Sequence, residues 1–88
     1  MSLFYLHQRR GASYIHDLEG AEFDTVENAR DEARVAIREL VSEMALTGIV
    51  DLTPSFEIVG EDGASMLVPF SGAVTVKTDL TGDLHDPV

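Results

Sequence analysis

The longest regular pattern of apolar positions lies in the middle of the chain and predicts a helix. Residues 26 to about 46 contain no Gly or Pro, and apolar residues recur three and four positions apart, as in an amphipathic helix. Asp24 and Thr25 are alternative N-caps, and Gly48 follows as a stop signal. About twenty residues make a helix about 30 Å long, enough to cross a four-stranded sheet.

The residues before this helix predict a β-hairpin. Residues 3–6 and 12–17 are strand-like runs separated by Arg9, Arg10 and Gly11. With Arg10 and Gly11 as the loop, position 7 lies opposite 14 and position 5 opposite 16. Alternation then divides the side chains between two faces, with Leu3, Tyr5, His7, Tyr14 and His16 on one and Phe4, Leu6 and Ile15 on the other.

The residues after the helix predict a second hairpin. Residues 56–59 and 65–70 are strand-like, and Asp62 before Gly63 is a strong signal for the turn between them. Pro69 denies its strand one ladder hydrogen bond, so it belongs at a sheet edge or at a bulge near Gly72. Residues 73–77 are then expected to carry on beyond the bend.

The order strand, strand, helix, strand, strand predicts one α+β domain over residues 1–77, followed by a mobile C-terminal tail at residues 78–88. This is the order of a β-grasp arrangement, in which the first and last strands lie parallel at the sheet centre. Because Pro69 disfavours a regular last strand there, another antiparallel order is the alternative. In both, one helix covers one face of a four-stranded sheet, with Phe4, Leu6 and Ile15 facing Ala33, Ile37 and Leu40.

Composition narrows the class of protein. The 88 residues include no Cys, which excludes disulfide scaffolds, thiolate zinc sites, iron–sulfur clusters and thiol chemistry, and agrees with a reducing cytoplasm. No stretch reaches the roughly 18 apolar residues of a membrane span, and Arg9 and Arg10 follow the first apolar run, unlike the basic residues of a secretion signal. We therefore expect a soluble cytoplasmic protein.

The charge balance bears on the partners. Six Lys and Arg against sixteen Asp and Glu give a net charge of −10, which repels nucleic acid phosphates and anionic lipid headgroups. We therefore expect neither nucleic acid nor membrane binding. The simplest explanation of the acidic excess is that it keeps the protein soluble. The alternative explanation is a surface that attracts a basic protein partner or mimics nucleic acid.

Charged side chains form two rows on the predicted helix. Turning each position by about 100° puts one row on each flank of the apolar stripe. The basic row is Arg30, Arg34 and Arg38, and the acidic row is Glu32, Glu39 and Glu43. The basic row is either a solvated helix edge with local ion pairs or a secondary binding patch.

The chain lacks recognisable catalytic motifs. It has no Cys nucleophile, no Gly-rich phosphate loop, no two-His zinc signature and no Ser in a nucleophile elbow. His7 and His16 are not directly opposite in the expected register, and Asp17 points to the other face, so a third metal ligand is missing. We expect no enzyme activity, no metal and no cofactor.

The face opposite the predicted helix is the candidate interface. With the helix on the Phe4 side, Tyr5, His7, Tyr14 and His16 lie on the open side of the sheet, and such half-polar rings suit recognition surfaces. The expected function is a protein interaction module that forms a homodimer sheet to sheet. The alternative is an ordinary solvent-exposed sheet face without a binding role. The runner-up function is a regulator of a basic partner, antitoxin-like or nucleic-acid-mimicking.

Four motifs stand out along the chain: an aromatic first strand ending in His, an Asp-x-x-Gly-x-Glu turn, a helix rich in Ala, Arg and Glu, and an Asp-Gly hairpin. Their residues are Phe4, Tyr5, Leu6 and His7; Asp17, Gly20, Glu22 and Phe23; Ala29, Arg30, Glu32 and Ala33; and Asp62 with Gly63. These motifs resemble those of a family of short, mainly alphaproteobacterial proteins catalogued as a domain of unknown function. The resemblance covers about residues 3–76 and implies the same organisation of the chain, without implying an activity.

Overall fold

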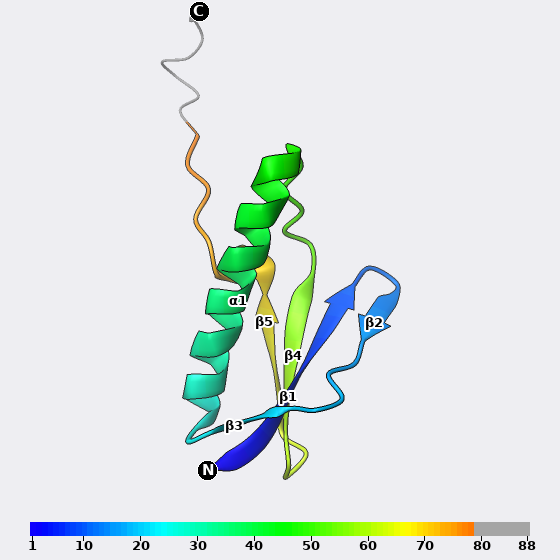
Figure 1. Cartoon of the computed structure of the whole chain (residues 1–88), viewed down its shortest axis with the longest axis vertical. Helices are drawn as coiled ribbons and strands as arrows, with labels where there is room; N and C mark the ends of the chain where they lie inside the picture. The colour runs from blue at the N-terminus through cyan, green and yellow to red at the C-terminus, as the bar shows by residue number, and fades with distance from the viewer. Residues whose placement is uncertain (79–88) are drawn as a thin grey trace, which may run out of the picture.

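The computed structural model, which describes residues 1–78, has one helix packed on one face of an open antiparallel sheet (Figure 1). This confirms the predicted α+β class. The elements in chain order are β1 (Ser2–Arg10), β2 (Ser13–Ile15), β3 (Ala21–Phe23), α1 (Val26–Thr47), β4 (Ser55–Gly60), β5 (Ser65–Pro69) and the short 3-10 helix η1 (Phe70–Gly72). The predicted tail lies, from residue 79 onwards, outside the described residues.

The sheet order is β2-β1-β4-β5, and every pair is antiparallel. The β-grasp arrangement is therefore wrong, and the alternative antiparallel order is correct. The long strand β1 pairs with β4 along one edge, and β2 and β3 share its other edge. The sequence analysis missed β3 because its three residues follow a strong turn signal and pair with distant positions on β1.

The first hairpin turns one residue later than expected. Arg10 pairs with Ser13, so the loop is Gly11 and Ala12, and Arg9 rather than His7 lies opposite Tyr14. Gly11 has φ +59°, a conformation that glycine adopts without strain. The register moves by two positions, and because side chains alternate with period two, the predicted division between faces is unchanged.

The ends of α1 and the second turn follow their local signals. Of the two candidate caps, Thr25 is the one in place, and its hydroxyl accepts a hydrogen bond from the Asn28 amide at 3.1 Å. Gly48 closes the helix in the left-handed conformation. In the β4–β5 turn, the Asp62 carboxylate accepts a hydrogen bond from the Ala64 amide at 3.0 Å.

The core lies between α1 and the strands β4 and β5. Its buried apolar residues come from the helix and from the sheet side, and Phe70 of η1 is the largest: Ala29, Ala33, Ile37, Ile58, Val68, Phe70 and Ala73. Phe4, Leu6 and Leu40 are half-buried against this cluster. Placing Ile15 in the core is wrong, since it is 52% exposed on the edge strand.

The chain after β5 closes the end of the core. Pro69 is the last residue of an edge strand, as its missing N–H requires. The Phe70 amide donates to the Pro54 carbonyl at 2.9 Å, and Arg38 Nε donates to the Ala73 carbonyl at 3.0 Å. No strand follows within residues 73–77, so the expected continuation is wrong; the chain leaves the sheet at η1.

Candidate functional site

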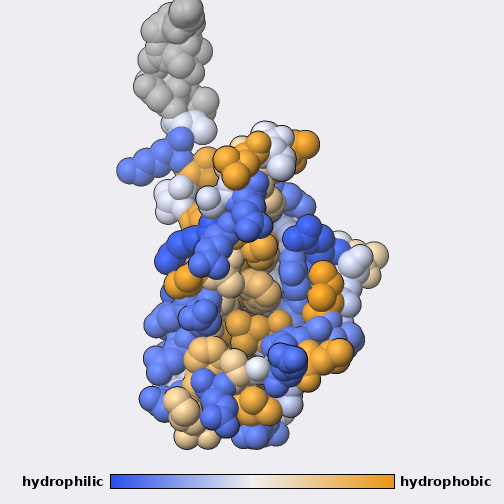
Figure 2. All heavy atoms as spheres, in the orientation of Figure 1, coloured by the Kyte–Doolittle hydropathy of each residue, from blue (hydrophilic) through white to orange (hydrophobic). Residues whose placement is uncertain are grey.

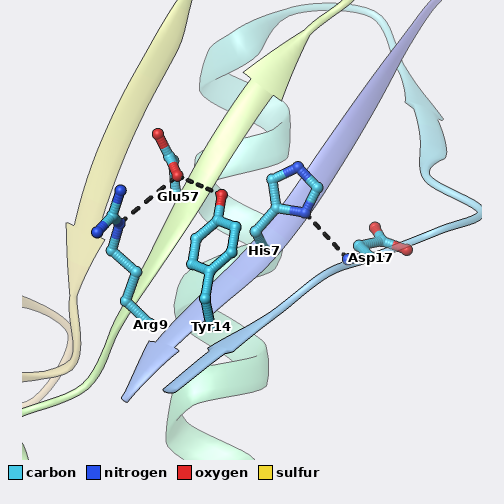
Figure 3. Close-up of polar contacts among 5 residues, drawn as sticks. All are labelled: His7, Arg9, Tyr14, Asp17 and Glu57. Atoms are coloured by element: carbon cyan, nitrogen blue, oxygen red, sulfur yellow. Dashed lines mark hydrogen bonds and ion pairs between the residues drawn. The ribbon is translucent and has the colours of Figure 1, made fainter. Parts of the chain in front are cut away.

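Four rings from β1, β2 and the residue after β2 gather on the sheet face that points away from α1. Figure 3 shows His7 and Tyr14 on this face with the helix behind the sheet. The His7 ring lies 6.1 Å from Tyr5, 5.6 Å from Tyr14 and 5.3 Å from His16, between ring centroids. Tyr14 and His16 meet edge to face at 4.6 Å. The structure therefore brings together all four residues of the predicted interface.

Glu57 of β4 and Arg9 of β1 complete this cluster, and neither was predicted to belong to it. The Tyr14 hydroxyl donates to Glu57 Oε1 at 2.6 Å, and Arg9 Nε lies 3.6 Å from the same oxygen. The Arg9 guanidinium also lies 5.0 Å from the centre of the Tyr14 ring. The hydrogen bond from Tyr14 lowers the pKa of Glu57, and the same bond raises the pKa of Tyr14.

The loop of residues 16–20, which we call the Asp17 loop, connects β2 to β3. It lies beside the part of β1 that neither of these two strands pairs with. Asp17 Oδ2 accepts from the Leu6 amide at 3.1 Å, and Oδ1 accepts from the amides of Glu19 and Gly20 at 3.2 and 3.1 Å. The Asp17 amide donates to His7 Nδ1 at 3.0 Å (Figure 3). A side-chain carboxylate thus replaces the missing ladder partner of β1, and one imidazole nitrogen is committed to holding the loop.

These amide donors make the charge of Asp17 part of the fold. Partial burial by itself raises the pKa of Asp17, but the hydrogen bonds from Leu6, Gly20 and Glu19 outweigh it and hold the pKa below its ordinary value. The stabilisation is therefore present above about pH 4, the ordinary carboxyl pKa, and is lost as the pH falls through the lower folded-state pKa.

Replacing Asp17 with Asn is expected to lower the free energy of unfolding at pH 7 by about 1–2 kcal/mol, because Asn keeps one acceptor oxygen for three amide donors. Urea denaturation at pH 7 and pH 3 measures this. The deficit should shrink at pH 3, because this lies below the ordinary carboxyl pKa of the unfolded chain and part of the wild-type stabilisation is then lost. Glu19→Gln in the same loop is the control. Equal losses in the two variants, or an unchanged Asp17→Asn deficit at pH 3, would contradict the assignment.

Apolar side chains of β4 and β5 extend the ring cluster across the sheet. By the register, Val59 lies beside Tyr5 and Leu67 beside Glu57 on the same face. Leu67 is 59% exposed and Tyr14 37% exposed, whereas Tyr5, His7 and Val59 are half-buried. We call this surface the open face; its residues are Tyr5, His7, Arg9, Tyr14, His16, Glu57, Val59 and Leu67.

The open face is a surface rather than a pocket. A hollow of about 280 Å³ lies at the other side of the sheet, lined by Phe4, Val26 and Met66 among others, and includes neither histidine. Within residues 1–78, no group of three or more His, Asp or Glu side chains is placed to hold a metal ion. In the same range, no helix combines the length and apolar character needed to cross a membrane.

The predicted secondary patch does not join the open face. Arg30, Arg34 and Arg38 lie on α1, on the other side of the sheet, and Arg38 is bound to the Ala73 carbonyl. Arg30 and Arg34 are half-buried along the helix flank. The row therefore stands apart from the aromatic cluster, and Arg38 helps to fix the segment after η1.

Comparison with known proteins gives one match. A family model described as Domain of unknown function (DUF6894) matches residues 3–71, which is more than half of the chain. No curated protein and no solved structure matches. The match covers all five strands, the helix and the Asp17 loop, and it confirms the resemblance drawn from the sequence motifs.

Proposed function

We propose a role for this chain, which belongs to the DUF6894 family of unknown function. The proposal is based on the open face. The protein is a non-catalytic interaction module that self-associates sheet to sheet. The supporting observation is an organised aromatic surface, with Tyr14 and Leu67 exposed, on a sheet whose single helix covers the other side. Tyr and apolar side chains at such a surface gain most from losing water on contact with a partner.

The distribution of charge favours a second copy as the partner. Two chains of net charge −10 repel each other unless they meet where acidic side chains are scarce. Among the acidic residues of the described strands, Glu22 and Glu57 point to the same side of the sheet as the open face, and Glu57 is paired with Arg9. Within residues 1–78, little charge is thus opposed when two copies meet there. The Cys-free composition suits the reducing cytoplasm, where we propose that the module acts.

Replacing Leu67 with Glu is expected to convert the dimer to a monomer at about 100 µM protein, a shift in the dissociation constant of at least about tenfold. The substitution puts a carboxylate on each of two copies in the middle of the contact, and because Leu67 is 59% exposed, the monomer fold tolerates it. Sedimentation velocity over a dilution series measures the change.

Val35→Glu is the matched control, since Val35 is 44% exposed on the outer side of α1 and receives the same added charge. It should leave the sedimentation coefficient unchanged. A wild-type protein that stays monomeric at about 100 µM, or equal effects of the two substitutions, would show that the open face is an ordinary solvated surface.

A further inference from the structure

The helix covers the inner face of the sheet unevenly. On β4 and β5, Ile58 and Val68 are 1% and 3% exposed, although β5 is an edge strand. On β1, an interior strand, the inward-facing Leu6 is only half-buried, and Ile15 of β2 is 52% exposed. Figure 2 shows the consequence: apolar atoms lie at the surface in a recess between the helix and the β1–β2 arm. α1 therefore covers β4, β5 and the first half of β1, where Phe4 packs against the core, and leaves β2 and the second half of β1 open.

The uncovered half has the width of one further helix. Strands lie about 4.8 Å apart and a helix with its side chains is about 10 Å wide, so one helix covers about two strands. At the level of β2 the sheet is four strands across, and α1 lies mainly over β4 and β5 there. The uncovered place over β2 and the second half of β1 runs beside α1. We call it the inner groove; its residues are Leu6, Gln8, Ile15, Ala36 and Leu40.

The helix flank beside the inner groove is acidic. The Arg38 contact with Ala73 shows that the arginine row faces the segment after β5. Helical periodicity then turns the opposite flank, with its three exposed glutamates, toward β1 and β2. Arg10 also lies on this side, but at the hairpin tip and near Asp51. Hydrogen bonds from Thr53 lower the pKa of Asp51, and the charge of Arg10 lowers it further. The groove is thus apolar inside and negatively charged along the rim formed by Glu32, Glu39 and Glu43.

One buried polar atom in the groove lacks a partner. Gln8 points inward from β1, beside Phe56 of β4, and its Nε2 is buried without a hydrogen-bond acceptor among the described residues. A buried unpaired amide destabilises a fold, so such groups are uncommon in finished cores. Among the described residues, the Nε atoms of Arg30 and Arg34 on the other helix flank are the further cases. An acceptor supplied by a bound chain would satisfy it.

From these observations we propose that the inner groove binds an amphipathic helix of a partner protein, one with a basic flank. Its apolar side covers Leu6, Ile15 and Leu40, and its Lys or Arg side chains face the glutamate rim. This surface is on the opposite side of the sheet from the open face, so the proposal is independent of self-association. A module with both surfaces can dimerise and hold one partner helix on each copy.

The test is fluorescence anisotropy with a labelled peptide of Leu and Lys whose Leu residues recur three and four positions apart. We expect a dissociation constant of about 1–10 µM, and at least about tenfold weaker binding of a peptide of the same composition with alternating Leu and Lys. Ile15→Gln should weaken binding of the first peptide about tenfold. Val35→Gln, which also replaces an exposed β-branched residue but on the outer side of α1, should leave it unchanged.

Three results would overturn the proposal. Equal binding of the two peptides would mean that the net charge alone attracts them. The same would follow if 0.5 M salt abolished the difference between their dissociation constants. Equal effects of Ile15→Gln and Val35→Gln would place the peptide elsewhere. Loss of self-association in Ile15→Gln would show that a second copy, and not a partner helix, occupies the groove.

Discussion

Replacing Phe70 with Ala is expected to lower the free energy of unfolding by about 3–5 kcal/mol, a large part of what so small a domain possesses. Phe70 is fully buried and is the largest residue of the core, and its ring lies 5.6 Å from that of Phe56. Its amide fixes η1 to Pro54. Removing the ring leaves a cavity between β4, β5 and α1 that the short connection cannot collapse to fill.

Thermal unfolding followed by circular dichroism measures this loss. The melting temperature of Phe70→Ala should fall by at least about 12 °C for a domain of this size. Phe70→Leu should lose less, because Leu refills most of the volume. Leu18→Ala, at a side chain that is 86% exposed, serves as the control. A Phe70→Ala variant that melts with the control would mean that η1 does not close the core.

Replacing Gly20 with Ala is expected to lower the free energy of unfolding by about 2–4 kcal/mol, more than the left-handed backbone alone requires. Gly20 has φ +71°, and an added Cβ would lie 2.9 Å from the Phe4 carbonyl oxygen. It would also lie 3.0 Å from the Tyr5 ring and 3.1 Å from Leu3. The substitution therefore pushes β3 off β1 and disturbs the edge of the open face.

Gly11→Ala separates the two causes. Gly11 has a similar φ of +59°, but an added Cβ there meets nothing within 4 Å. We expect a loss of about 1 kcal/mol at Gly11, so the excess at Gly20 measures the crowding against β1. Urea denaturation of the two variants gives the comparison. Equal losses in the free energy of unfolding would show that crowding against Phe4 is not why the Asp17 loop has glycine at this position.

The parts of the fold that local chemistry determines were predictable from the sequence. Apolar spacing of three and four gives α1, and Thr25 and Gly48 fix its ends because their caps involve neighbours within one turn. The β4–β5 turn follows from Asp62 and Gly63, whose carboxylate and left-handed φ act within four residues. Each signal needs no knowledge of distant contacts.

The parts of the fold that depend on pairing between distant residues were not predictable from the sequence. Nothing local distinguishes the parallel centre of a β-grasp sheet from the β1–β4 antiparallel pair. A register shift of two keeps every side chain on its face, so alternation could not choose between Arg10–Gly11 and Gly11–Ala12 as the loop. The strand β3 pairs with positions about twenty residues away on β1, and the turn before it is tied to β1 by the hydrogen bond from Leu6 to Asp17, eleven residues apart in the chain.

The candidate site shows the same division. Alternation in β1 and β2 gathered Tyr5, His7, Tyr14 and His16, because a face depends only on period two. Glu57 was missed although it lies between Phe56 and Ile58, where alternation in a predicted strand places a charge on the face opposite the core. Arg9 was missed because it was counted among the residues that separate the first two strand-like runs. The off-centre position of α1 depends on packing and has no sequence signal.

An isotope-filtered NOE experiment on a refolded mixture of labelled and unlabelled chains can show whether two copies meet through the open face, as we propose. Such a spectrum reports only contacts between copies. We expect contacts from the Leu67 methyl groups to the rings of Tyr5 and Tyr14. A spectrum without contacts between copies, or one whose contacts come from Ile15 and Leu40 instead, would contradict it.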